Sequence, residues 1–255
     1  MTTSPSAGGS LTADRALKVL QEVVLDDRPV LLDELAARVG LSRTVTYRLV
    51  RSLENAGYIE RDSRQGGYTI AATFVSMSVR TANRFNAGRR LRPAMDEIVK
   101  VTGETVSFHV RNGMQRVAVE VAEGVHSIRR VIPVGEVLPL CSGESGRVLC
   151  SGLSDADLET LLQEAEGTSH DMHNFREDTA VVRETGYFLA VGLRTPDVGA
   201  ISFAVPGPAG ALGALTVSGP AHRWTAAEMK AAAPRILEIL KANTITTTSP
   251  ANGGS

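Results

Sequence analysis

The sequence has few cysteines and no long apolar run. Cys141 and Cys150 are its only cysteines; they have no CxxC or metal-ligand spacing, and two reduced thiols in a cytoplasmic protein are the simplest interpretation. No apolar stretch approaches the roughly 18–20 residues of a transmembrane helix, so we expect no membrane partner. The chain does not open with a basic segment followed by an apolar core, which argues against a signal peptide.

The chain also lacks an excess of positive charge. Its formal net charge is −1 over 255 residues, which by itself argues against a nucleic-acid partner. The arginines are, however, unevenly distributed: residues 42–51 contain three and residues 79–92 contain five, and neither segment contains an acid. Because phosphate contacts need positive charge only at the docking face, DNA binding remains open.

Residues 31–57 have the pattern of a helix-turn-helix. Apolar residues at helical spacing predict a short helix over 32–39, and Gly40 can take a positive φ that ends it. Ser42 is a good N-cap for a second helix, whose outer face we expect to be polar and basic. In this arrangement the second helix reads DNA in the major groove. The candidate DNA-binding residues on it are Ser42, Arg43, Thr44, Thr46, Tyr47, Arg48 and Arg51.

A β-wing is predicted to follow. Residues 58–61 and 68–70 have the composition of two short strands, and the loop at 62–67 is polar and contains glycine. Arg64 at its tip is placed to reach a phosphate or a minor groove. A further short strand is expected beside the wing at 30–32. The alternative for the whole region is a helical hairpin with a solvated charged face.

Composition and periodicity divide the chain into five parts. Residues 1–10 and 244–255 are rich in Ser, Thr, Gly and Pro and should be disordered. Residues 11–71 form the winged helix, 72–87 a linker helix carrying Arg80 and Arg84, and 88–243 a second domain. The first helix, between Leu11 and Asp26, is expected to bury a stripe of Leu17, Leu20, Val23 and Val24.

The second domain is predicted to be mixed α and β. Hairpin strands in succession, with helices outside them, indicate an antiparallel sheet flanked by helices, a sensor architecture of the GAF/PAS kind. The whole chain is therefore expected to be α+β. The expected strands are a hairpin around Asn112-Gly113 and segments 128–134, 187–191, 199–205 and 211–218. The expected helices cover about 90–101, 153–165 and 175–185, and a last one is capped by Thr225 and Glu228.

Together these segments resemble the IclR (isocitrate lyase regulator) family of bacterial transcription regulators over about residues 11–243. The winged-helix part is LDELAARVGLSRTVTYRLVRSLENAGYIER. The later part is carried by LPLCSGESGRVLCSGL (138–153), GYFLAVGLRTPDVGAISFAV (186–205) and LTVSGPAHRWT (215–225). The resemblance implies a cytoplasmic homodimer or homotetramer whose sensor domain binds a small organic molecule and alters affinity for a DNA operator.

Carried onto matching positions, the resemblance implies an effector site around a turn and the last strand. N–H groups at a helix start suit a carboxylate, and hydroxyls two residues apart on a strand share a face. Arg130 and Ile132 on the predicted strand 128–134 are further candidates. The positions implied at the turn are Gly143, Glu144 and Ser145, and those on the last strand are Thr216 and Ser218.

The chain departs from the family pattern at several of these positions. Many relatives carry an acidic residue where this chain has Ala190 and a cysteine where it has Ala200. Asp197 stands where a glycine is usual, and Gly143-Glu144 replaces a small Thr-Ala pair. We therefore predict a roomier and more apolar pocket, with Ala190 and Ala200 in its wall. The predicted effector is an aromatic or apolar carboxylic acid.

An enzyme and a metalloprotein are less well supported. Gly143 to Gly146 resembles a nucleophile elbow but lacks one intervening residue, and His170, Asp171 and His173 have no further ligand set. We therefore predict no catalytic residue, metal or cofactor. The leading hypothesis is a ligand-responsive regulator that binds a pseudo-palindromic operator. The alternative is a sensor protein whose winged helix mediates protein–protein association, against which the basic outer face of residues 42–51 argues.

Overall fold

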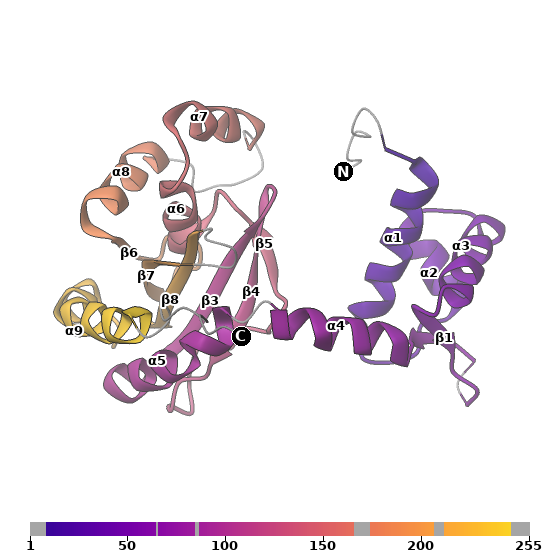
Figure 1. Ribbon diagram of the computed structural model, residues 1–255, viewed down its shortest axis with the longest axis horizontal. Helices are drawn as coiled ribbons and strands as arrows, with labels where there is room; N and C mark the ends of the chain where they lie inside the picture. Colours follow the sequence, from indigo (N-terminus) through magenta and orange to yellow (C-terminus); the bar gives the residue numbers. More distant parts are fainter. Residues whose placement is uncertain (1–8, 65, 85–86, 166–173, 207–211, 246–255) are drawn as a thin grey trace, which may run out of the picture. The chain divides into compact units, whose positions relative to one another are not determined.

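The computed structural model describes residues 9–64, 66–84, 87–165, 174–206 and 212–245. The chain divides into two units, Met1–Arg84 and Phe85–Ser255, whose ribbons Figure 1 shows. Most of the two ends predicted to be disordered lies outside the described residues. None of the described helices combines the length and the apolar character that a bilayer span requires.

The first unit is a winged helix. Its helices are α1 (Leu11–Val24), α2 (Leu32–Val39), α3 (Arg43–Asn55) and α4 (Ala72–Arg84), and its two strands are β1 (Ile59–Arg61) and β2 (Tyr68–Ile70). The predicted helix ends are confirmed. Gly40 ends α2 with φ 68°, and the Ser42 hydroxyl accepts a hydrogen bond from the N–H of Val45 at 3.4 Å. Val30 adds only an isolated bridge to Tyr68 beside the wing.

The buried face of α1 differs from the predicted stripe. Val19, Leu20 and Val23 are buried in the core of the winged helix. Leu17 and Val24, which the periodicity placed in that core, are 56% and 46% exposed. Their assignment to the buried stripe is wrong because the helix turns Val19, rather than Leu17 and Val24, toward α2 and α3. The unit therefore presents apolar side chains to solvent along α1.

The second unit is built on an antiparallel sheet of six strands in the order β5-β4-β3-β8-β7-β6. These strands are β3 (Thr105–Asn112), β4 (Gln115–Ala122), β5 (Val137–Pro139), β6 (Tyr187–Val191), β7 (Val198–Pro206) and β8 (Leu212–Pro220). Helices α5 (Ala87–Thr102) and α9 (Ala226–Ile245) cover one face. The other face packs against α6 (Gly143–Ser151), with α7 (Asp155–Glu164) and α8 (Phe175–Thr185) beyond it. The predicted α+β architecture is confirmed.

The two faces of the central strands have opposite character. Phe108 of β3 and Leu215 and Val217 of β8 are buried in the core with α5 and α9. Successive side chains of a strand point to opposite faces, so their neighbours Ser107 and Thr216, paired across β3 and β8, face α6. Both of these polar residues are buried. A polar layer therefore lies between the sheet and α6.

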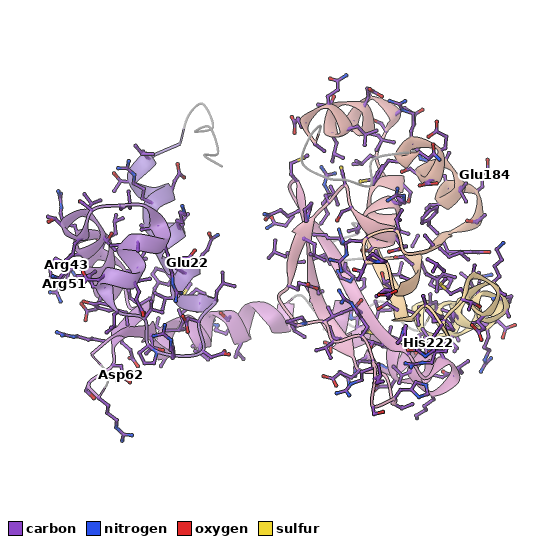
Figure 2. The ribbon with its side chains drawn as sticks, turned by 180° about the vertical axis from the view of Figure 1, so that it is seen from behind. Glu22, Arg43, Arg51, Asp62, Glu184 and His222 are labelled. Atoms are coloured by element: carbon purple, nitrogen blue, oxygen red, sulfur yellow. The ribbon has the colours of Figure 1, made fainter. Side chains whose placement is uncertain are left out.

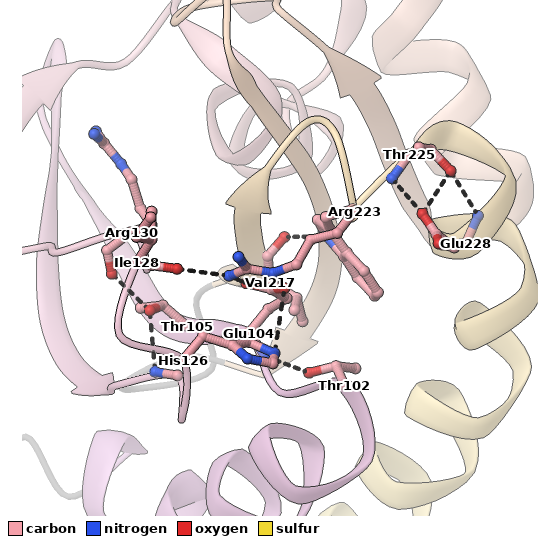
Figure 3. A network of polar contacts seen from close by, with 12 residues as sticks. Thr102, Glu104, Thr105, His126, Ile128, Arg130, Val217, Arg223, Thr225 and Glu228 are labelled. Carbon is pink, nitrogen blue, oxygen red and sulfur yellow. Dashed lines mark hydrogen bonds and ion pairs between the residues drawn. The ribbon is translucent and has the colours of Figure 1, made fainter.

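The predicted strand at 128–134 is wrong, because this segment has no strand partner. Side chains satisfy its carbonyl groups instead of a neighbouring strand. The Thr105 hydroxyl donates to the carbonyl oxygen of Arg130 at 2.6 Å, and Arg223 Nη2 donates to that of Ile128 at 2.8 Å (Figure 3). The segment is thus held beside the start of β3 as an irregular wall.

A buried ion pair anchors the same region. Glu104, whose side chain is 2% exposed, accepts hydrogen bonds on both oxygens from Arg223, at 2.6 Å from Nε and 3.0 Å from Nη2. This bond to Glu104 raises the pKa of the Arg223 guanidinium above its usual value. Gly219 is required beside it, since a Cβ there would overlap the carboxylate. The pair joins the start of β3 to the turn between β8 and α9.

We predict that Arg223→Met lowers the free energy of unfolding of the second unit by about 3 kcal/mol, because it leaves the Glu104 carboxylate buried without its partner. The matched control is Arg235→Met. Arg235 pairs with Glu97 at 3.1 Å on the surface, and loss of such a pair costs less than about 1 kcal/mol. Denaturant unfolding of both variants checks this, and equal losses would contradict it.

Candidate functional site

A cavity lies between the sheet and α6, on the polar face described above. Its volume is about 470 Å³ including its open mouth. Residues of β3, β4, β7 and β8 line it from the sheet, α6 lines it from the other side, and the segment after β4 contributes a wall. The irregular segment and the buried pair of Glu104 and Arg223 therefore position one side of this site.

Six of the eight predicted effector residues line this cavity: Arg130, Glu144, Ser145, Ala200, Thr216 and Ser218. Gly143 and Ala190 are not among the lining residues. Thr216 and Ser218 share the cavity face of β8 as predicted, and the Thr216 hydroxyl lies 2.9 Å from that of Ser202. The structure thus brings together segments more than 80 residues apart in the chain, from Arg130 to Ser218.

The prediction of an apolar wall is wrong. Ala200 lines the cavity but Ala190 does not, and the rim near Ala200 is formed by Arg194, Thr195 and Val198. With Arg116 and Arg130 the cavity is lined by three arginines, against two carboxylates. The two alanines could not reveal this, because the arginines come from β4, from the irregular segment after it, and from the turn between β6 and β7. The site is polar and cationic on balance.

The first turn of α6 packs closely on the segment that follows β5. Gly146 has no room for a side chain, because a Cβ there would overlap the carbonyl oxygen of Leu140. Arg147 is fully buried and its Nε donates to Asp178 of α8 at 2.6 Å. Its guanidinium lies 4.7 Å from the centre of the Phe175 ring, and its Nη1 donates to the carbonyl oxygen of Gly143 at 3.2 Å. These contacts fix the first turn of α6 over the cavity.

The sequence analysis missed a group of polar lining residues: Ser107, His109, Arg116, Glu136 and Arg194. His109 is 4% exposed, and burial, together with the charges of Arg116 and Arg194, lowers its pKa to about 3. The ring is therefore neutral at neutral pH. Its Nε2 lies 2.9 Å from the Ser107 hydroxyl. The sequence signal that could have found them is spacing: Ser107 and His109 are two residues apart on one strand face, as are Thr216 and Ser218.

The outer face of α3 carries most of the predicted DNA-binding residues. Arg43, Tyr47 and Arg48 are exposed on it, and Figure 2 shows Arg43 and Arg51 at the surface of the winged helix. Thr46 was placed on this face wrongly, since it is 0% exposed. Its hydroxyl donates to the carbonyl oxygen of Ser42 at 3.1 Å. Thr46 thus supports the first turn of α3 from inside.

The exposed arginines of this unit differ in their contacts. Arg43 Nε forms an ion pair with Asp33 of α2 at 2.9 Å, and Arg51 pairs with Glu54 at 2.8 Å. Within the described residues, Arg48 of α3 and Arg64 of the wing form no ion pair. Ser42 and Thr44 are exposed at the start of α3. A basic surface with unpaired guanidinium groups suits phosphates and base edges.

The other candidate groups do not form a site in the described structure. His170, Asp171 and His173 lie outside the described residues, and no cluster of metal-ligating side chains occurs within them. Cys141 and Cys150 are buried, and the hydrogen bond between them, together with burial, raises the pKa of Cys150. A thiol held in its protonated form is a poor nucleophile.

Comparison with known proteins gives two family matches. The model "Bacterial transcriptional regulator IclR C-terminal" matches residues 79–245, and the model "IclR helix-turn-helix domain" matches residues 12–63. The chain is 27% identical to the HTH-type transcriptional regulator BhcR of Paracoccus denitrificans, over 92% of this chain and 86% of BhcR. It is also 27% identical to the HTH-type transcriptional regulator KipR of Bacillus subtilis, over 61% of this chain and 64% of KipR.

The fold also matches solved structures. An IclR homologue from Microbacterium hydrocarbonoxydans, crystallised in complex with 4-hydroxybenzoate, superposes with a TM-score of 0.73 over 92% of this chain and 96% of that one. Its sequence identity to this chain is 19%. At this identity the match establishes the shared fold alone.

Proposed function

Because the chain belongs to the IclR family of bacterial transcriptional regulators, we propose that it binds a pseudo-palindromic operator and changes its operator affinity when a small organic acid enters the cavity under α6. The chain is a regulator and not an enzyme, with an N-terminal helix-turn-helix DNA-binding domain and a C-terminal ligand-binding domain. The proposed domains are residues 11–71 for DNA, 72–87 for the linker and 88–243 for the effector. This function requires access to the chromosome and therefore a cytoplasmic protein.

The exposed basic face of α3 supports operator reading by this helix. Arg43 and Arg48 lie within its first two turns, where side chains of a recognition helix reach base edges. Arg43 must exchange its ion pair with Asp33 for a base or phosphate, whereas Arg48 has no such pair to break. Arg64 at the wing tip is proposed to contact a phosphate or a minor groove. The exposed basic face is the observation that carries the DNA-binding proposal.

We expect Arg48→Ala and Arg43→Ala each to weaken binding to the specific operator about 5- to 150-fold, the loss that follows from one guanine contact. The matched control is Asn55→Ala, which is exposed at the end of the same helix, outside its first two turns, and should leave operator choice unchanged. Fluorescence anisotropy at several salt concentrations measures the affinity of each variant for the specific duplex and for a scrambled one. If the chain binds neither duplex at low salt, the alternative of protein association by the winged helix is favoured.

A homodimer, or a dimer of dimers, is proposed to present two such helices to the operator. One winged helix buries too little surface for strong selectivity, and two-fold symmetry doubles the contact. Exposed apolar side chains support an interface on the first unit: Leu17 and Val24 on α1, and Val75 and Val79 on α4. Exposed apolar residues that share one face of a helix, as each of these two pairs does by its spacing, favour association sites.

We predict that the double variant Val75→Asp and Val79→Asp weakens dimerisation at least about 10-fold, because buried unpaired charges oppose association. The control is Val131→Asp in the second unit, which is 61% exposed and lies outside the proposed interface. Sedimentation velocity over a micromolar concentration series measures the difference. A monomeric wild type, with and without DNA, would overturn the dimer proposal.

The cavity chemistry supports an organic acid as the effector. Arg130 and Arg194 line it, and neither forms an ion pair within the described residues. The start of α6 adds the positive end of a helix dipole, and Ser145 and Ser218 supply hydroxyls. Ile132, Leu138 and Val198 offer apolar contacts for a compact aromatic or aliphatic body. The homologue crystallised with 4-hydroxybenzoate has the same fold and makes aromatic acids the first probes.

We expect at least one acid from a panel of aromatic, hydroxy and keto acids to raise the melting temperature of the full chain, since binding to the native state stabilises it. The double variant Thr216→Val and Ser218→Ala should weaken binding of that acid by about 1–3 kcal/mol by leaving the anion underpaired. Calorimetric titration measures the loss, and operator binding without ligand should survive. Unchanged acid binding would contradict this placement of the carboxylate.

A further inference from the structure

Several buried polar atoms in the cavity have no hydrogen-bond partner among the described residues. They include His109 Nδ1, Glu136 Oε2 and Ser218 Oγ, and these three residues line the same cavity. His109 and Ser218 are each 4% exposed. Because a buried polar group without a partner costs free energy, such groups gathered around one cavity point to an occupant that bonds them. We propose that Ser218 bonds the carboxylate of the effector, so the unbonded atoms of His109 and Glu136 need a different partner.

His109 and Glu136 flank one small residue of β4. His109 pairs with Ala118 across β3 and β4, and the N–H of Ala118 donates to the carbonyl oxygen of Glu136 at 3.0 Å. Glu136 and His109 are therefore the neighbours of Ala118 on its two sides. The side chains of both residues line the same cavity.

The chemistry of His109 and Glu136 limits which group of a ligand can bind both of them. The carboxylate of Glu136 only accepts hydrogen bonds, so the occupant must donate one. The His109 ring is neutral, and the Ser107 hydroxyl occupies its Nε2. When that hydroxyl donates to Nε2, His109 carries its proton on Nδ1 and donates it to the occupant. A hydroxyl meets both demands, because it donates to Glu136 and accepts from His109 at once.

Other occupants fit less well. A second carboxylate on the effector would be repelled by Glu136, and an apolar substituent would leave both atoms unbonded. The same repulsion turns the effector's single carboxylate away from Glu136, and Arg130 and Arg194 line the cavity as its cationic partners.

We propose that His109 and Glu136 form a hydroxyl-binding pole of the effector site and select hydroxy acids over the same acids without the hydroxyl. The proposal rests on the proposed function, since it assumes that the cavity binds the acid by its carboxylate. His109 and Glu136 are the specificity-determining residues. A cavity built to bond a hydroxyl discriminates strongly against an analogue that lacks it, since its own buried groups are then left unpaired.

The test uses the full chain and matched pairs of acids: benzoate with 3- and 4-hydroxybenzoate, and propanoate with 3-hydroxypropanoate. By calorimetry we expect the better hydroxy acid to bind about 10- to 100-fold more tightly than its partner without the hydroxyl. Glu136→Ala and His109→Phe should each remove most of that ratio while leaving the weak affinity for the plain acid. The control is Glu123→Gln, on the same segment but exposed and paired with Arg129, which should keep the ratio.

Each other outcome is informative. Equal binding of both members of every pair would overturn the hydroxyl pole and leave the acid site standing. Equal weakening of both members by Glu136→Ala would show that Glu136 acts only on the shape of the cavity and would also overturn it. If no acid of the set binds or displaces another acid from the wild type, the proposed function itself fails. Binding of a dicarboxylate more tightly than of the hydroxy acids would contradict the role given to Glu136.

Discussion

The antiparallel pairing of β3 with β8 is the constraint on which the second unit depends. Its register places Ser107 opposite Thr216 and Phe108 opposite Leu215. A shift by one residue would turn each of these side chains to the other face. The apolar set would then face the cavity, and the polar set would lie against α5 and α9. The hydrophobic core under these helices and the polar site under α6 are therefore set by the same pairing.

The cavity can keep its shape without a ligand, because hydrogen bonds within the protein hold both of its walls. The pair of Glu104 and Arg223 holds the wall segment through the carbonyl group of Ile128. On the opposite side Arg147 ties α6 to α8 through Asp178. With both walls held in this way, a few cavity-lining groups can stay without protein partners. An effector that bonds them gains free energy without having to order the wall, which is the advantage of a preorganised site.

Local sequence patterns predicted most of the fold but fewer of the site residues. Caps and turn residues identified α2, α3 and α9, because a cap is decided within one helical turn. Helical periodicity erred for Thr46 and Leu17, since which face of a helix is buried depends on partners that are distant in sequence. The segment at 128–134 has the composition of a strand, but the carbonyl group of Ile128 is bonded by Arg223 and not by a neighbouring strand. Because Arg223 is distant in the sequence, no local pattern predicts this contact. His109 was missed for the same reason, since only tertiary structure brings it beside Glu136 and the arginines.

The most direct test of the account is a crystal structure of the full chain with the acid that raises its melting temperature most. The account predicts the acid between α6 and strands β3 and β8, with its carboxylate toward Arg194 and the start of α6. Its hydroxyl, where it has one, should lie within hydrogen-bond distance of Glu136 and His109. An acid bound on another surface, with the cavity under α6 filled only by water, would contradict the account.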